Sequence, residues 1–165
     1  MPVEVTVEDG TGKPNANSYA SVATADAYFG SRPRSDAWRS LTAEQRGRLL
    51  IHATRLLDAS FVWDGRKLSS AQALEFPRYP EEMDAQELPG SVFVATCELA
   101  AQLNLADITA DASNAQFSKI EVGPIKLEMA PAAQQQAQIP SFIRNLVAQY
   151  GTLRGRSLNV RLVRA

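Results

Sequence analysis

Few residues in this chain of 165 could carry out acid–base or nucleophilic chemistry. It contains one histidine, His52, and one cysteine, Cys97. A Cys–His pair could supply a nucleophile and its base, but both residues fall inside predicted helices, where no turn exposes a nucleophile. We therefore expect a surface histidine and a small buried thiol. Two such residues also fall short of the four ligands that structural zinc requires, so no metal site is predicted.

Carboxylates are more numerous, but their spacing does not indicate a catalytic pair. Asp58 with Asp64, or Glu81 with Glu82, could in principle divide general acid–base work between them. They fall on predicted helix surfaces and loops, so we expect solvated side chains. The sequence thus predicts no enzyme, no catalytic residue and no cofactor.

Four aromatic residues could stack the bases of single-stranded nucleic acid, because basic side chains are close to them in the sequence. They are Trp38, Trp63, Phe76 and Tyr79, with Arg66, Lys67 and Arg78 nearby. Large aromatic side chains beside helix ends more commonly belong to the core, and this is the main expectation. Nucleic-acid stacking stays open as the alternative.

The net charge of −1 conceals an uneven distribution along the chain. Residues 81–128 hold nine acidic and two basic side chains, whereas residues 129–165 hold five arginines and no acid. A net charge near zero gives no general attraction to nucleic acid or to anionic membranes. This separation of acidic and basic residues could serve head-to-tail contacts between copies, or a basic tail that docks on an acidic partner. Alternatively, the terminal arginines only solvate a frayed end of the chain.

The length and the 45% hydrophobic fraction predict one globular domain with a real core. No apolar run approaches the roughly 20 residues of a membrane helix. The first residues lack the pattern of a signal peptide, and one cysteine cannot form an intrachain disulfide. We expect an aqueous, reducing compartment and no membrane partner.

Capping residues and apolar periodicity locate the predicted helices. Ser21 begins one helix, and the capping box Thr42–Gln45 begins a longer one that extends to about Phe61. A second box, Ser69 with Gln72, predicts a short helix that stops before Pro77.

Two further helices are predicted in the second half of the chain. Pro89 begins a central helix that ends near Asp107, and Pro140 begins a last helix with Gly151 as its stop. Residues 130–139 are expected to form a low-complexity linker.

A change to period-two alternation predicts a β-hairpin at residues 117–129, with Gly123-Pro124 as its turn. Because a lone hairpin is marginal in water, it must pack on the helices or on another subunit. The fold class predicted is mainly α: a small bundle of about four helices, one hairpin and an extended C-terminal tail. We divide the chain into an extended N-terminal loop (1–20), a helical domain (21–151) and a tail (152–165).

Several segments, in order along the chain, resemble a group of tailed-phage and prophage proteins. The segments are Val7–Tyr19, Ala23 with Asp26–Phe29, Ala53-Thr54 with Leu57-Asp58, Trp63 with Gly65, Gln72–Leu74, Phe76–Arg78, Pro89, Ala95–Ala100 and Val122–Ile125. Such proteins are often described as DnaT-like single-stranded DNA-binding proteins. They are also similar to the head–tail adaptor (connector) proteins of long-tailed phages.

The adaptor resemblance implies a structural virion protein. It would form a ring of twelve copies between the portal protein and a tail or head-completion protein, with genomic double-stranded DNA passing through the lumen. It would be found in the virion neck, and in the host cytoplasm during assembly. The resemblance is lost beyond residue 130. The alternative is a DnaT-like single-stranded DNA-binding replication accessory protein.

The residues themselves favour the adaptor, because coating single strands needs a basic groove that a net charge of −1 does not supply. We expect the hairpin to pack between subunits and the tail to dock on the portal as an added strand with arginines. The hairpin residues are Ile120, Val122, Gly123, Pro124, Ile125 and Leu127. The tail residues are Arg154, Arg156, Leu158, Val160, Arg161, Leu162 and Arg164.

Overall fold

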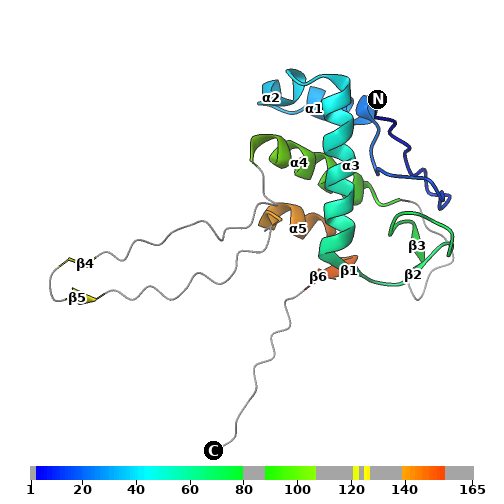
Figure 1. The fold of residues 1–165 in the computed structure, drawn as a ribbon. Coiled ribbons are helices and arrows are strands. Elements are labelled where there is room, and N and C mark those ends of the chain that lie inside the picture. Colours follow the sequence, from blue (N-terminus) through cyan, green and yellow to red (C-terminus); the bar gives the residue numbers. More distant parts are fainter. Residues whose placement is uncertain (1–2, 80–87, 107–120, 123–124, 127–138, 155–165) are drawn as a thin grey trace, which may run out of the picture.

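The structure is a computed structural model that describes residues 3–79, 88–106, 121–122, 125–126 and 139–154 (Figure 1). The helices in this part of the chain are α1 (Val22–Gly30), α2 (Asp36–Arg39), α3 (Ala43–Ser60), α4 (Gly90–Leu105) and α5 (Ser141–Val147). The strands are β1 (Phe61–Trp63), β2 (Arg66–Lys67), β3 (Arg78–Tyr79), β4 (Glu121–Val122), β5 (Ile125–Lys126) and β6 (Gly151–Leu153).

The long helix α3 is the central support of the fold. Its first turn has the predicted capping box: the Thr42 hydroxyl accepts from Gln45 N, and the Gln45 side chain accepts from Thr42 N. One face buries Leu50 and Leu57, which continue at the spacing of a helical stripe. At 1.5 Å per residue the helix spans about 27 Å, so it contacts both ends of the body.

Helix α4 crosses behind α3 and packs on both α3 and α5 (Figure 1). It is apolar on much of its circumference, and Val92, Cys97 and Leu99 are fully buried. Helix α5 contributes Ile143 and Val147 to the same core. A helix that is apolar nearly all round is typical of a core position.

The short helices α1 and α2 close one end of α3. Ser21 caps α1 as predicted, since its side chain accepts from Thr24 N. The rings of Phe29 and Trp38 lie 4.6 Å apart and join the two helices. Asp26 accepts from Trp38 Nε1 at 2.8 Å and pairs with Arg46 at 2.9 Å, so polar contacts hold the same corner.

Strands β1 and β6 form an antiparallel pair that joins the end of α3 to the end of α5, with Val62 opposite Thr152. Gly151 is needed here for its missing side chain. A Cβ at this position would lie 2.5 Å from Val62 O and 2.9 Å from Trp63 Cα. The predicted role of Gly151 as a helix stop was wrong: α5 ends at Val147, and Gly151 begins a strand.

The predicted fold class, a helical bundle with one hairpin and an extended tail, was wrong. The described residues form five helices together with the antiparallel sheets β1–β6 and β2–β3, which the bundle lacked. Strands of two or three residues are too short to show an alternating pattern in the sequence. The fold is mixed, with helices packed against small sheets and a structured N-terminal loop.

Two local expectations were also wrong. Residues 69–73 form turns and bends instead of a helix. The Gln72 side chain does accept from Ser69 N, as a capping box requires, but its NH₂ group donates to Leu74 O and Pro77 O and holds the following chain in a turn. Ile139, assigned to a linker, is 2% exposed and belongs to the core. Its burial fixes the chain just before α5.

The predicted hairpin is confirmed where the structure describes it. β4 pairs with β5, with Glu121 opposite Lys126 and Val122 opposite Ile125, which is the register that the predicted turn at Gly123-Pro124 requires. In Figure 1 these two strands stand apart from the helices. The rest of the predicted hairpin, including Ile120, Gly123, Pro124 and Leu127, lies outside the described residues.

Candidate functional site

The antiparallel ribbon β2–β3 presents the clearest arrangement of an exposed cation with an aromatic ring. Gly65 has a φ of +73°, which allows the turn that leads from β1 into β2. Register then places Arg66 opposite Tyr79. The Arg66 guanidinium lies 4.5 Å from the centre of the Tyr79 ring, a cation–π contact. Arg66 is exposed and Tyr79 is half-buried, so solvent reaches this pair.

The two other cations expected at this site are neutralised. Glu75 pairs with Lys67 at 3.1 Å and with Arg78 at 2.7 Å. Arg78 also donates to Asp64 O at 2.8 Å and to Trp63 O at 3.2 Å. Arg78 therefore holds the β2–β3 ribbon against the end of β1, and its positive charge is already neutralised by Glu75.

Three of the four aromatic residues proposed for base stacking are in the core. Trp38, Trp63 and Phe76 are 3%, 6% and 2% exposed. Trp63 and Phe76 pack edge to face with ring centres 5.0 Å apart, while Trp38 lies at the other end of α3. The main expectation of core packing is confirmed for these three, and only Tyr79 keeps an accessible ring.

A hydrogen-bonded group beneath the ribbon fixes its position. Asp58 accepts from Tyr19 Oη at 2.7 Å and from Glu75 N at 3.1 Å, and Tyr19 Oη accepts from Phe76 N at 3.1 Å. Burial raises the pKa of Asp58 to about 6, although the hydrogen bonds from Tyr19 and Glu75 act in the opposite direction. Burial likewise raises the pKa of Tyr19 well above its usual value. Asp58 thus joins α3 to two loops. The expectation that the Asp58 side chain is solvated was wrong.

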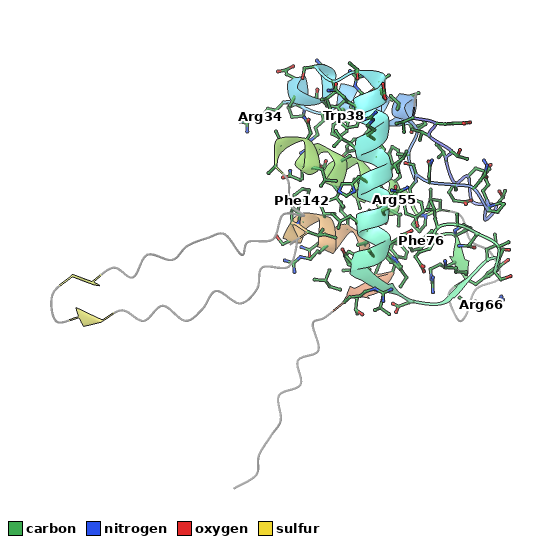
Figure 2. The ribbon with its side chains drawn as sticks, viewed as in Figure 1. Arg34, Trp38, Arg55, Arg66, Phe76 and Phe142 are labelled. Carbon is green, nitrogen blue, oxygen red and sulfur yellow. The ribbon has the colours of Figure 1, made fainter. Side chains whose placement is uncertain are left out.

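Arg34, Arg55 and Arg66 are exposed, and none of the three has a carboxylate partner within the part of the chain that the structure describes (Figure 2). Arg34 has a φ of +62°, a left-handed conformation that is uncommon for a residue with a side chain. These side chains come from the α1–α2 turn, from α3 and from β2, so they are spread over the molecule.

The expected portal-docking tail is described only at its start. Thr152 and Leu153 belong to β6, and Arg154 donates from N to Ser60 O and from Nε to Phe61 O. These residues are therefore held by the body. The remaining tail residues, Arg156, Leu158, Val160, Arg161, Leu162 and Arg164, lie outside the described residues.

The structure also locates the residues considered for nucleophilic and acid–base chemistry. Cys97 is buried in α4, where burial raises the pKa of its thiol to about 12, and His52 is exposed on α3. Glu81 and Glu82 fall outside the described residues. Among those described, no three His, Cys, Asp or Glu residues form a group suited to a metal ion. None of the described helices combines the length and the apolar character needed to span a bilayer.

Comparison with known protein families shows to which family this chain belongs. The model of the family described as "Putative DnaT-like ssDNA binding protein" matches residues 3–165. The chain belongs to this family. The resemblance to DnaT-like proteins is thereby confirmed, and the expectation that it is lost beyond residue 130 was wrong, because the match continues to residue 165. The family description favours single-stranded DNA binding over the phage adaptor. Neither the curated proteins nor the solved structures contain a match to this member of the DnaT-like family.

Proposed function

We propose that this protein binds single-stranded DNA, in keeping with the description of its family, and that Arg66 and Tyr79 are its contact residues. The observation that supports this is the exposed Arg66 guanidinium lying over Tyr79 without a carboxylate partner among the described residues. Arginine can bind a phosphate while the neighbouring ring stacks a base. Since Trp38, Trp63 and Phe76 are buried, the protein contacts few bases and binds weakly at a net charge of −1.

Binding of a fluorescent oligonucleotide, measured by anisotropy over a salt series, tests this function. Replacing Arg66 with Ala should weaken binding and lower the slope of log K against log salt by about 0.7, the share of one phosphate contact on a single strand. Tyr79→Ala should cost about 1–3 kcal/mol of binding free energy, the value of one stacked base.

The matched control is Arg39→Ala, which removes an exposed cation that already faces Asp36 at 4.0 Å. It should leave both affinity and slope nearly unchanged. Absence of salt-dependent binding by the unaltered protein would exclude the function. An equal loss in the Arg39 variant would show that the Arg66–Tyr79 pair is not the contact site.

A second candidate, the phage head–tail adaptor, is favoured by the β4–β5 hairpin. Its register matches the sequence expectation, and its strands stand apart from the helices, available to another subunit (Figure 1). Burial of the aromatic side chains also suits a protein that does not read bases. In this proposal copies form a ring of twelve that contacts the portal and a tail or head-completion protein, and double-stranded DNA passes through the lumen.

Quantitative mass spectrometry of purified virions of the encoding phage distinguishes the two functions. An adaptor should be retained in DNA-filled particles at about one copy per portal subunit. Its absence from virions, together with abundance in infected-cell lysate and salt-dependent oligonucleotide binding, would overturn the adaptor and support the DNA-binding function.

A further inference from the structure

The outward face of α3 carries three basic or titratable side chains. Arg48, His52 and Arg55 are exposed and follow one another at four and three residues, which puts them on one side of the helix. They extend over about 10 Å of its length. In Figure 1, α4 passes behind α3 and no described element crosses in front of it. We call these three residues the α3 basic face.

Charge on the α3 basic face is little neutralised. Arg48 pairs with Glu44 at 2.7 Å, but both side chains are largely exposed, so solvent screens the pair and it contributes little. Arg55 has no carboxylate partner within the described part of the chain. Arg55 lies in the C-terminal half of α3, and Figure 2 labels it beside this helix. An anionic partner could therefore bind here without first displacing a strong ion pair.

The chain itself contains a segment of complementary charge. Residues 81–87 hold four acids, Glu81, Glu82, Asp84 and Glu87, and no base. The segment lies outside the described residues, but the residues on either side are described. Tyr79 is paired in β3, and Leu88 packs against the core. The acidic segment is thus attached to the body at both ends, so each copy carries one basic face and one acidic segment.

We propose that the α3 basic face binds the acidic segment, residues 81–87, of a second copy of this chain. Opposite charges on two different surfaces favour a head-to-tail contact and disfavour a face-to-face one. Such a contact leaves one free surface at each end, so it propagates into a ring or a filament. The inference rests on neither proposed function and is compatible with both.

Sedimentation velocity of the full chain over a concentration series tests the contact. The unaltered protein should associate as its concentration rises, less so at high salt, because exposed charges are screened beyond a Debye length. Arg55→Glu should weaken association about tenfold, since reversing the charge replaces attraction with repulsion. The matched control is Arg34→Glu, because Arg34 is also exposed, lies outside α3 and has no carboxylate partner among the described residues. This variant should associate normally.

Mixing two variants shows whether the contact joins different chains. Arg55→Glu keeps an intact acidic segment, and Glu82→Lys keeps an intact α3 basic face. Each alone should associate weakly, and an equimolar mixture should associate more strongly than either. Unchanged melting temperatures would show that both variants are folded.

Three results would overturn the proposal. One is an unaltered protein that stays monomeric at every concentration; another is a mixture no better than its components. The third is an Arg34→Glu variant as impaired as Arg55→Glu. Normal association of Arg55→Glu with lost oligonucleotide binding would instead assign the face to DNA.

Discussion

Glu8 holds the N-terminal loop in its conformation by binding the loop's own backbone. Its carboxylate accepts from Gly10 N and Gly12 N at 2.9 Å and from Lys13 N at 2.8 Å, and the side chain is fully buried. Gly10 and Gly12 have positive φ values, which direct their N–H groups toward one point. The loop is thus ordered by a carboxylate that serves as an internal anion.

Replacing Glu8 with Gln should destabilise the protein by about 1–3 kcal/mol, because the new NH₂ group would face a buried backbone donor. The midpoint of urea unfolding measures the loss. Asp9→Asn is the control: Asp9 is exposed and pairs with Lys13 in solvent, so its midpoint should move little. Equal shifts of the urea midpoint in the two variants would show that the buried hydrogen bonds of Glu8 stabilise the protein no more than the exposed contacts of Asp9.

Stability should depend on pH through Asp58. Its pKa is about 6 in the folded protein against an ordinary value of 3.8, so the folded state holds the proton more tightly. The contribution of Asp58 then favours folding fully below pH 3.8 and is lost as the pH rises through 6, by at most about 3 kcal/mol. Urea unfolding from pH 4 to pH 7 measures it.

Asp58→Asn should flatten this pH dependence, because Asn does not titrate and still offers Tyr19 one acceptor. A variant that keeps the full slope between pH 4 and 6 would assign the effect to another group. The partners of Asp58 could not be foreseen from the sequence, since Tyr19 and Glu75 lie 39 and 17 residues away. Burial of a carboxylate depends on such distant contacts, whereas burial of Trp63 follows from the residue type alone.

At the scale of elements, local signals were predictable and distant pairings were not. The capping box at Thr42–Gln45 and the cap at Ser21 involve residues three apart, and both are present. The β4–β5 hairpin is also local. The pairing of β1 with β6 joins residues about 90 positions apart, which no sequence period reveals. Gly151 was consequently assigned to the nearest local role.

Gly151→Ala should destabilise the protein by about 1–3 kcal/mol, because the new methyl group would overlap the β1 backbone. Thermal unfolding measures the change. Gly30→Ala is the matched control: it ends α1, and nothing lies within 4 Å of its added Cβ. That variant should be neutral or more stable by up to about 1 kcal/mol. A Gly151 variant as stable as the unaltered protein would contradict the close approach of β6 to β1.

For the whole molecule, the position of β6 separates the body from the rest of the tail. Deleting residues 155–165 should leave the melting temperature unchanged, because Leu153 and Arg154 complete the contacts with β1. Deleting residues 152–165 should lower it, since β1 would lose its partner strand. Calorimetry of both truncations tests this, and equal melting temperatures would show that β6 adds nothing to stability. Only the shorter deletion can then test docking of the tail.

The function of the whole molecule was less predictable than its helices. Charge and hairpin residues favoured a ring-forming adaptor, whereas the family description favours single-stranded DNA binding. Sequence proximity correctly predicted that the aromatic and basic residues of the 63–79 region lie close together in the structure. Which of the cations would be paired was not predictable, because it depends on Glu75, which neutralises Lys67 and Arg78 and leaves Arg66 to Tyr79.

The direct packing of α4 on α5 has a consequence for how this protein can vary. These helices meet although residues 106–140 separate them in the sequence, so the body already holds the two ends of that stretch together. Doubling the length of a flexible connection between fixed ends costs only about 0.6 kcal/mol of closure entropy. Relatives could therefore lengthen, shorten or exchange the hairpin while the body keeps its stability.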